Sequence, residues 1–586
     1  MSKNLAWKDV DWKLVHKRLS RQQSRVYKAS IEINTAKVHA LQRRIIGSLD
    51  AKLIAVRRVT TENKGRNTAG VDGQKAIPNE MKMKLASKLT LDGKAKAIRR
   101  VYIPKPGKSE FRPVGIPTIE DRAKQMLAKL ALEPEWEAIF EPNSYGFRPG
   151  RSCHDAIASL FLSLRGKSRF VLDTDIQKCF DRIDHKKLLK KLSTFGQMEN
   201  QIAAWLKADI MVGYFDRPDE IFQPLEGVHH KGGGGIIYPL LANIALHGLE
   251  TYLKEWYATS WYPFTGLSRK IPMRDRKASI GFSRYADDFV ITAPEISDIK
   301  QIEKQVEIWL SEEVGLSLSK AKIRIINSTE GFKFLGFQLI SIKKSGQYKI
   351  KIHPSKTSKK RLIAKIREII SKNRSASSYN LIKLLAPRIV GWGNYFRFSE
   401  CQIDFSKLDY SIFSQLRAWA FRRKSKGLRS RTKLKEKYFP NGKTYVFRGK
   451  DYTNNWVLAG QTMIKGQKKE NFLPKLAWIE SGQYTKIKGN ASPYDDNHLY
   501  WAQRMEKYSG FNHTISKLIK QQYDRCVICK ERFTPMDVIE TDHIVPRSKG
   551  GADKFENLQA LHKHCHIQKS FSDSTVSMDP LSVVGS

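Results

Sequence analysis

Acidic residues follow β-prone runs at two widely separated places in the chain. Asp287 and Asp288 stand side by side in residues 283–291, and Asp175 emerges at the end of the apolar run 170–172. Adjacent carboxylates repel unless a cation lies between them and a substrate, and Mg²⁺ takes one or two protein carboxylates together with phosphate oxygens and water. A third carboxylate completes a two-cation cage suited to in-line phosphoryl transfer. The pattern predicts nucleotidyl-transfer chemistry.

Simpler roles remain open for several of these acids. An exposed hairpin turn is the alternative for Asp287 and Asp288, because Asp is common in turns. Asp173 shares a strand face with Asp175 by period-two alternation. For Asp173, and for Asp181 and Asp184 beyond the strand, a local turn or capping role is the alternative.

A second group of chemically reactive residues lies near the end of the sequence. Cys526 and Cys529 form one pair, and Cys565 follows in a His-rich segment. This spacing suits a tetrahedral Zn²⁺ held by the three cysteines with His562 as the fourth ligand, and His564 is an alternative fourth ligand. Because the chain has only six cysteines, a metal site in a reducing compartment is favoured over a disulfide scaffold.

The elements that must position these residues change in character along the chain. Apolar periodicity, turn residues and composition separate six stretches. They are a basic helical start (7–58), a polar loop (60–73), an α+β centre (to about 339), a mainly helical stretch (362–439), a loosely structured connector or binding surface (440–500) and a separate tail (500–570).

The charge composition indicates a polyanionic partner. The 586 residues include 104 Lys and Arg against 58 Asp and Glu, a formal net charge of +46, which excludes an ordinary neutral metabolic enzyme. Since the charge is spread along the whole chain, nucleic acid is favoured over an anionic membrane, with a merely solvated surface as the alternative. We find no signal-peptide pattern and no apolar run of the ~20 residues that span a bilayer, so we expect a soluble, cytoplasmic protein.

The segment Tyr285-Ala286-Asp287-Asp288 resembles the YxDD box of reverse transcriptases, and its neighbours resemble the group II intron reverse transcriptase/maturases. These blocks follow in order along the chain: RVYIPKPG (100–107), RPVGIP (112–117), SYGFRPGRS (144–152), PLLANIAL (239–246) and GFKFLGF (331–337). The resemblance implies a right-hand polymerase, with fingers, palm and thumb, that copies RNA into DNA using Mg²⁺ and deoxynucleoside triphosphates. It further implies that Asp175, Asp287 and Asp288 hold the metal ions.

The same resemblance assigns roles in nucleotide binding. Phe180 would lie under the sugar as a steric gate against a 2′-hydroxyl, with a buried apolar residue as the alternative. Lys105 and Arg112 would bind triphosphate oxygens from the fingers, although each could be a surface cation. Lys322 would protonate the leaving pyrophosphate, and the nearby Lys320 makes that assignment less specific.

The chain departs from the family in the turn before Ile236. Where the family usually has a Pro-Gln-Gly-Gly-like turn, this sequence has four glycines, residues 232–235. Gly233 replaces the side-chain amide that would touch the nucleotide or template, and a run of glycines loses more conformational freedom on ordering. We therefore expect a competent metal site whose polymerase activity could be impaired.

The helical stretch resembles the family's thumb, called domain X, through residues 387–396 and 405–409. Between Arg422 and Lys437 there are nine Lys or Arg and one acid, flanked by aromatic residues. Clustered cations neutralise phosphates and aromatic rings stack on unpaired bases, whereas a solvated basic helix face is the alternative. In the family this region grips the intron RNA. The candidate RNA-binding residues are Arg422, Arg423, Lys424, Arg429 and Arg431.

The tail resembles the HNH endonuclease motif through Asp542-His543, Asn557 and His566. The resemblance implies a ββα-metal nuclease in which Asp542 and His566 hold one Mg²⁺, His543 deprotonates water as a general base, and Asn557 orients the loop carrying that base. A structural zinc knuckle that only binds DNA is the alternative. Family members often carry Cys at the position of His562.

Together these observations predict an α+β multidomain protein: a right-hand polymerase with a helical thumb and a small ββα-metal HNH domain with zinc. We expect it to copy RNA into DNA, bind intron RNA as a splicing maturase and nick target DNA, in target-primed retrohoming. A splicing maturase with impaired polymerase activity and a DNA nuclease with a targeting front half are the alternatives. The expected divisions are an N-terminal extension and start of the fingers (1–75), fingers and palm (76–345), domain X (346–445), a DNA-binding connector (446–500) and the HNH domain (501–586).

Overall fold

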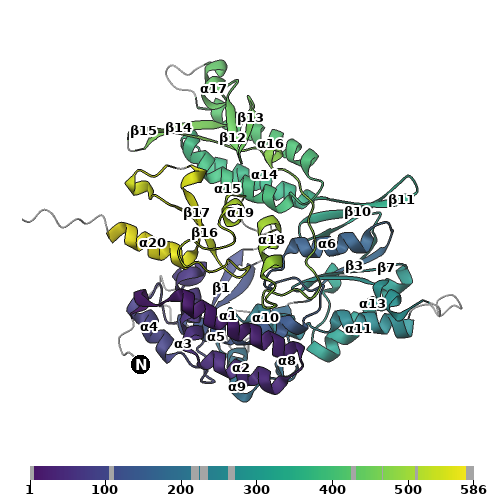
Figure 1. The fold of residues 1–586 in the computed structure, drawn as a ribbon. Helices are drawn as coiled ribbons and strands as arrows, with labels where there is room; N and C mark the ends of the chain where they lie inside the picture. Colours follow the sequence, from purple (N-terminus) through teal and green to yellow (C-terminus); the bar gives the residue numbers. More distant parts are fainter. Residues whose placement is uncertain are drawn as a thin grey trace, which may run out of the picture.

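The computed structural model describes residues 6–104, 111–177, 179–212, 223–224, 235–261, 271–423, 430–464, 466–508, 513–552 and 554–575. The N-terminal helices lie at one end of the molecule and the long helices α14, α15 and α16 at the other, with the C-terminal elements between them on one side (Figure 1). The protein is therefore a mixed α/β chain with several cores, as the sequence predicts.

A bundle of helices opens the chain. Asp11, Asn34 and Ser48 precede three of these helices and accept hydrogen bonds from the first-turn backbone amides, which satisfies donors that the helix itself leaves unpaired. Val26 and Ile45 are fully buried, and α1 and α2 pack against α5. The elements are η1 (Trp7–Asp9), α1 (Trp12–Ile31), α2 (Thr35–Gly47), α3 (Leu49–Arg57), η2 (Arg58–Glu62), η3 (Lys64–Asn67), α4 (Asn79–Lys88) and α5 (Ile119–Ile139).

Two four-stranded sheets follow, with strand orders β2-β1-β4-β5 and β6-β7-β3-β8. The first comprises β1 (Ile98–Pro104), β2 (Phe111–Ile116), β4 (Ile210–Val212) and β5 (Gln223–Pro224), and the second β3 (Phe170–Asp175), β6 (Gly281–Tyr285), β7 (Asp288–Ala293) and β8 (Arg324–Asn327). In the second sheet, successive residues point to opposite faces, so Val171 enters one hydrophobic core and Leu172 the other. Burial on both faces holds β3 and β7 rigidly in the middle of the molecule.

Helices surround these sheets. They are α6 (Cys153–Leu164), α7 (Cys179–Arg182), α8 (His185–Leu192), α9 (Gly196–Lys207), α10 (Tyr238–Ala245), α11 (Leu249–Trp256), η4 (Tyr257–Trp261), α12 (Met273–Ala278), α13 (Ile296–Trp309), η6 (Leu310–Val314) and η7 (Lys320–Lys322). Asp184 accepts a hydrogen bond from the Lys187 amide and so caps α8, which is the local role that the sequence left open for it. Among the described helices, none combines the length and the apolar character needed to cross a lipid bilayer.

A helical module with a three-stranded antiparallel sheet (β11-β10-β9) and two further β-hairpins stands at the far end of the molecule. Its elements are β9 (Phe332–Phe334), β10 (Phe337–Lys344), β11 (Gln347–Pro354), α14 (Lys356–Lys372), α15 (Ser378–Phe396), α16 (Gln402–Phe421), α17 (Arg431–Tyr438), β12 (Thr444–Phe447), β13 (Lys450–Thr453), β14 (Ala459–Ile464) and β15 (Gln467–Phe472). The expectation of a loosely structured stretch is therefore wrong for residues 444–472, where Tyr445, Phe472 and Trp478 pack into a small core that orders both hairpins.

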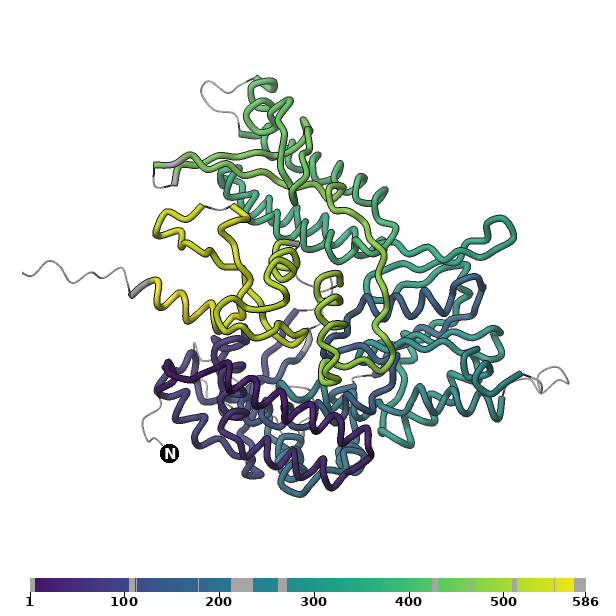
Figure 2. Tube along the Cα trace, viewed as in Figure 1, coloured from purple at the N-terminus to yellow at the C-terminus, as the bar shows by residue number. Residues whose placement is uncertain are grey.

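The segment between β15 and the C-terminal domain crosses the molecule in an extended path (Figure 2). It contains η8 (Leu476–Trp478), and the domain beyond it comprises α18 (His498–Tyr508), α19 (His513–Gln521), β16 (Ile539–His543), η9 (Arg547–Lys549), η10 (Phe555–Asn557), β17 (Leu558–His562) and α20 (Lys563–Thr575). The extended segment and α18 are anchored by Asp155, a fully buried acid in the first turn of α6. The Asp155 carboxylate accepts hydrogen bonds from the Arg504 guanidinium (2.5 Å), the Ile487 amide (2.8 Å) and the Tyr484 hydroxyl (3.0 Å).

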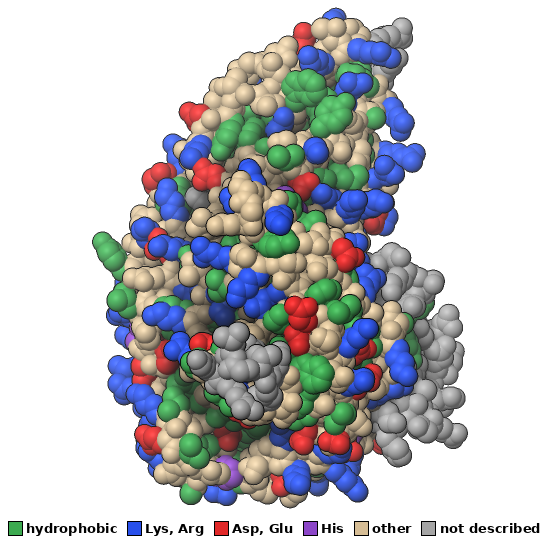
Figure 3. Space-filling model, turned by 90° about the vertical axis from the view of Figure 1, so that its right-hand side faces the viewer, with side chains coloured by type: hydrophobic (Ala, Val, Ile, Leu, Met, Phe, Trp, Pro, Cys, Tyr) green, Lys and Arg blue, Asp and Glu red, His purple; other side chains and the backbone are tan. Residues whose placement is uncertain are grey.

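Basic side chains are widely distributed on the face of the molecule seen in Figure 3. In the side view of Figure 3, Lys and Arg are spread over the whole visible face and acidic groups are fewer. This distribution agrees with the net charge of +46 and favours contacts with nucleic acid along this face.

Replacing Asp155 tests how the connector is held. Asp155→Ala leaves the guanidinium of Arg504 buried without its carboxylate, so we expect docking of the segment 473–508 to weaken by about 3 kcal/mol. Limited proteolysis should then cut this segment much faster. Glu400→Ala, which removes an exposed ion pair with Lys351, is the control and should leave the cleavage rate unchanged; equal rates in the two variants would contradict the anchoring role.

Candidate active site and metal centres

Three predicted acids meet at one end of the sheet β6-β7-β3-β8. Asp175 is the last residue of β3 and lies opposite Asp288, the first residue of β7, as a cross-strand pair. Asp287 precedes Asp288 in the turn that joins β6 to β7. Asp175 and Asp288, 113 positions apart in the sequence, are thus neighbours, because directly paired antiparallel residues have Cβ atoms about 5 Å apart.

Buried polar contacts fix the turn that carries two of these acids. Ala286 has a left-handed backbone (φ 60°). The guanidinium of Arg284, fully buried, donates to the Ala286 carbonyl (3.2 Å) and to the Asn243 side-chain oxygen (3.1 Å). Asn243 in turn donates to the Gly146 carbonyl (2.8 Å). A Cβ at Gly146 would lie 2.3 Å from the Ala286 nitrogen, so this close approach requires glycine.

The environment of the acids suits a cation. One oxygen of Asp175 pairs with the Lys322 ammonium, whereas Oδ1 is buried and has no hydrogen-bond partner in the described part of the chain. Burial, followed by the charges of Asp287 and Asp173, raises the pKa of Asp288 to about 6. Burial likewise raises the pKa of Asp173 to about 6. Carboxylates crowded in this way, with an unused buried oxygen, fit the ligand set of a divalent cation.

The other residues proposed for nucleotide binding are only partly described. Phe180 lies in α7, half-buried, and lines a small cavity with Tyr238 of α10. Lys322 lies beside Asp175, as stated above. The backbone of Arg112 belongs to β2, but its side chain lies outside the described residues, as do Lys105 and the glycines 232–234.

A buried amide that sequence reasoning missed holds the end of the glycine turn. Gly235 has a φ of +131°, and the Gln125 side-chain oxygen accepts a hydrogen bond from the Ile236 amide (2.8 Å). A Cβ at Gly235 would lie 2.1 Å from that oxygen. Gln125 is fully buried in α5, and its Nε2 has no partner among the described residues. Glycine at position 235 thus leaves room for the polar side chain of Gln125, which comes from α5.

The candidate RNA-binding arginines differ in their surroundings. Arg423 lies over the Trp419 ring (4.5 Å from the centroid) and donates to the carbonyls of Arg374 (2.7 Å) and Ala376 (2.8 Å) between α14 and α15, so it holds a loop. Arg422 and Arg431 are exposed. Two of the five candidates lie outside the described residues, Lys424 and Arg429.

A compact sulfur and nitrogen cluster forms in the C-terminal domain. The ligand atoms of Cys526, Cys529, His562 and Cys565 all lie within 4.8 Å of one another. Three of these side chains are buried, and Nδ1 of His562 points at the Cys529 sulfur (3.3 Å). The set of three thiols and one imidazole fits tetrahedral metal coordination. His564, the alternative fourth ligand, lies outside the cluster and stacks on His562 (5.2 Å between centroids).

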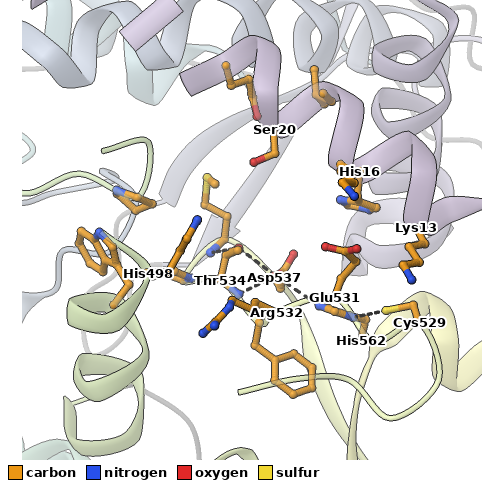
Figure 4. Close-up of a pocket in the computed structure, with 18 of the residues that line it drawn as sticks. Lys13, His16, Ser20, His498, Cys529, Glu531, Arg532, Thr534, Asp537 and His562 are labelled. Atoms are coloured by element: carbon orange, nitrogen blue, oxygen red, sulfur yellow. Dashed lines mark hydrogen bonds and ion pairs between the residues drawn. The ribbon is translucent and has the colours of Figure 1, made fainter. Parts of the chain in front are cut away.

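Asp537 orients the histidine of this cluster. The Asp537 carboxylate lies 3.4 Å from Nε2 of His562 and also accepts hydrogen bonds from the Thr534 amide and hydroxyl (2.7 and 2.8 Å). Figure 4 shows Asp537, His562 and Cys529 together, facing His16 of α1 across a cleft of about 430 Å³. An acid on the remote nitrogen leaves Nδ1 as the metal-facing atom. The sequence offered no signal for this role, because Asp537 lies in an irregular loop.

The predicted nuclease residues gather on β16 and α20. His566 places Nε2 3.4 Å from the Asp542 carboxylate and Nδ1 2.8 Å from the Glu540 carboxylate. The Lys569 ammonium donates to the His543 carbonyl (2.8 Å) and pairs with Asp542 (3.1 Å). Asp542 and Nε2 of His566 therefore fit a shared metal, with Glu540 orienting the imidazole. Glu540 shares the strand face of Asp542 by period two, which is the signal that could have found it.

Asn557 fastens the loop between the two strands of this domain. Its side-chain oxygen accepts from the Val545 amide (2.9 Å), and its Nδ2 donates to the Val545 carbonyl (3.1 Å) and the Ala552 carbonyl (2.9 Å). The Ile544 amide also donates to the Asn557 carbonyl (2.8 Å). These bonds fix the backbone that follows His543.

Comparison with known proteins assigns each of these regions. Residues 103–339 match the family described as reverse transcriptase (RNA-dependent DNA polymerase), and residues 7–89 match the N-terminal domain of reverse transcriptase. Residues 359–439 match the maturase-specific domain of group II introns, and residues 526–572 match the HNH endonucleases. Protein YkfC of Escherichia coli (strain K12) is 33% identical over 306 residues, which cover 48% of this chain and 78% of YkfC.

This chain belongs to the group II intron reverse transcriptase/maturases. The group II intron-encoded protein LtrA of Lactococcus lactis subsp. cremoris is 29% identical over 335 residues, and the match spans 49% of this chain and 54% of LtrA. Maturase-like protein 1 of Euglena gracilis is 23% identical over 411 residues, which are 69% of this chain and 79% of that protein. The family predicted from the sequence is confirmed, and its domains are those of an RNA-directed DNA polymerase, a maturase and a DNA endonuclease.

The orienting role of Asp537 in this reverse transcriptase/maturase is testable by metal content. Asp537→Leu removes the acceptor for Nε2 of His562, so we expect zinc affinity to fall by about 10- to 100-fold. Competition with a chromogenic chelator measures that affinity directly. Glu531→Gln alters a carboxylate elsewhere on the same cleft and should leave zinc affinity unchanged; a normal affinity in Asp537→Leu would contradict the role.

The raised pKa of Asp288 predicts a pH-dependent cation requirement. Below a pKa of about 6 the carboxyl of Asp288 binds a proton, and a protonated carboxyl is a poor cation ligand. The Mg²⁺ concentration for half-maximal primer extension should therefore rise steeply as the pH falls from about 7.5 to about 5.5. Mg²⁺ titrations at several pH values measure this shift, and a requirement independent of pH would contradict it.

Proposed function

We propose that this chain is the multifunctional protein of a group II intron, with RNA-directed DNA polymerase, splicing maturase and DNA-nicking activities. In this proposal the sheet β6-β7-β3-β8 is the palm, β1 and β2 with the N-terminal helices belong to the fingers, and α14, α15 and α16 form the thumb. The divisions 1–75, 76–345, 346–445, 446–500 and 501–586 are kept as the proposed domains. The partners are the intron RNA, target DNA and deoxynucleoside triphosphates.

Polymerisation would take place at the carboxylate cluster. Asp175, Asp287 and Asp288 would hold Mg²⁺, which activates the primer 3′-hydroxyl and stabilises the leaving oxygen of the triphosphate. Lys322, which pairs with Asp175, would give a proton to pyrophosphate. Phe180 would press on the sugar and exclude a 2′-hydroxyl. The basic loops that carry Lys105 and Arg112 would neutralise the triphosphate.

Nicking would take place at the HNH domain. His543 would take a proton from the attacking water, and Asn557 holds the backbone beside it. Asp542 and His566 would hold Mg²⁺, which stabilises the scissile phosphate. Zn²⁺ on Cys526, Cys529, His562 and Cys565 would serve structure, since four protein ligands leave no open position for a substrate.

Maturase function would depend on the helical module. The exposed cations Arg422 and Arg431, with Lys424 and Arg429, are proposed to bind intron RNA phosphates. Arg423 has the more local role of holding the loop between α14 and α15. By analogy with the family, the excised intron RNA would reverse-splice into one DNA strand, the HNH domain would nick the other, and the exposed 3′-hydroxyl would prime DNA synthesis.

The observation that carries this proposal is the cross-strand pair Asp175 and Asp288 with Asp287 in the adjoining turn. Asp287→Ala should lower Mg²⁺-dependent primer extension on an RNA template by at least about 1000-fold while intron binding and splicing assistance persist. His543→Ala should instead abolish nicking of DNA and spare extension. Full extension by Asp287→Ala would refute the metal assignment.

The alternative of a splicing maturase with impaired polymerase activity rests on the glycines 232–234, which lie outside the described residues. The intact carboxylate cluster and the match to the polymerase family support an active enzyme instead. Primer extension by the unaltered protein distinguishes the two, because the alternative predicts tight intron binding without extension.

A further inference from the structure

The HNH domain packs directly on the N-terminal helices. The α20 helix lies against η2, and the Lys563 ammonium donates to the Glu62 carbonyl (3.0 Å). The His564 ring stacks on His16 of α1 (5.4 Å between centroids, 13° between planes). Figure 1 shows α20 lying along the N-terminal elements. The nuclease residues on α20 therefore have a second wall opposite them, built from a different part of the chain.

Two depressions lie along this junction and share residues. The smaller, about 380 Å³, contains Glu540 and His566 of the nuclease cluster together with Arg66 of η3. The larger, about 950 Å³, contains Trp7 and Lys82 and again Arg66. Ile567 and Phe571 of α20 also belong to both. The depressions thus form one groove, which we call the α20 groove, running from the nuclease cluster along the N-terminal helices.

The positive charge in the larger part of the α20 groove suits an anionic ligand. Lys8, Arg66 and Lys82 line its larger part, and no acidic side chain lines that part among the described residues. Burial and the neighbouring charge of Arg66 lower the pKa of Lys82. Lys82 also lies 5.9 Å from the centroid of the Trp7 ring. In this larger part, like charges held together without a lining carboxylate, beside apolar and aromatic walls, suit a nucleic-acid strand.

Hydrogen bonds from a buried arginine, Arg122, fix the backbone around Arg66. The guanidinium of the buried Arg122 donates to the carbonyls of Gly65 (2.9 Å) and Thr68 (2.8 Å), on either side of Arg66. The guanidinium of Arg66 itself donates to the Thr61 carbonyl (2.8 Å). Arg66 is thereby held at the point where the two depressions meet, so little conformational freedom would be lost on binding a phosphate.

We propose that the α20 groove binds the DNA strand that the HNH domain nicks, and that the N-terminal region supplies phosphate-binding residues Arg66, Lys82 and Lys8 to the nuclease. This inference rests on the proposed nicking activity. It goes beyond it by making the N-terminal region of the reverse transcriptase part of the nuclease substrate site. Continuity with Glu540 and His566 favours the nicked DNA strand over the intron RNA as the occupant.

The double variant Arg66→Gln/Lys82→Gln tests the proposal in the full-length protein. We expect the KM for nicking of supercoiled plasmid to rise while the rate at saturation is kept. Two lost phosphate contacts should also reduce the slope of log affinity against log salt by about 1.8 for duplex DNA, or about 1.4 for a single strand. Fluorescence anisotropy with a labelled duplex or single-stranded oligonucleotide measures that slope.

Matched controls are available on the same elements. Lys64→Gln and Lys84→Gln make equivalent charge changes at exposed positions of η3 and α4 and should leave both KM and salt slope unchanged. Lys8→Gln, at an exposed position of the groove, should reduce the slope by about one even if the double variant unfolds. Values for the groove variants equal to those of the controls would overturn the proposal. If the unaltered protein does not nick in a His543-dependent manner, the proposed function fails, and the salt slope of binding still decides the groove.

Discussion

Burial of acidic groups at one end of the sheet that carries Asp175, Asp287 and Asp288 is the constraint around which the centre of this protein is organised. Burial, followed by the charges of Asp287 and Asp173, raises the pKa of Asp288, and a fold tolerates that cost only with nearby positive charge. Lys322 supplies one such charge by pairing with Asp175. Beneath the turn, the buried Arg284 donates to Asn243 and to the Ala286 carbonyl, and these bonds fix the backbone that carries Asp287 and Asp288.

The same constraint explains why sequence blocks far apart in the chain belong together. Gly146, Asn243 and Arg284 come from three blocks, yet their contacts all serve the geometry of one turn. A larger side chain at Gly146 would displace the Ala286 backbone and with it both adjacent acids. These residues are therefore coupled to the carboxylate cluster through packing and hydrogen bonds, without any direct part in the chemistry.

Local patterns sufficed to predict part of this architecture. The apolar run before Asp175 predicts its strand, and capping chemistry predicts a role for Asp184 that the structure contains. Contacts between distant segments left no such signal. Gln125 of α5 contacts the end of the glycine turn, and Asp537 contacts His562 from a loop. The hairpins of residues 444–472 depend on a small aromatic core that the composition of this stretch did not indicate. The docking of α20 on η2 left no local signal either, because the contacting segments lie far apart in the sequence, with Lys563 and Glu62 501 positions apart.

The two candidate metal centres of the HNH domain share one feature. In each, a carboxylate contacts the histidine ring nitrogen that faces away from the other ligands. Asp537 serves His562 in this way and Glu540 serves His566. This arrangement has a particular consequence at His562, where the ligand is an imidazole and not a thiolate. A thiolate needs no partner to fix its donor atom, whereas an imidazole presents two nitrogens, and only an acceptor on one of them commits the other to the metal. An imidazole ligand at position 562 thus brings a requirement for Asp537, and Asp537 places an acidic group at the cleft that faces α1. Asp537 in this way links the metal site to the cleft between the nuclease domain and the N-terminal helices.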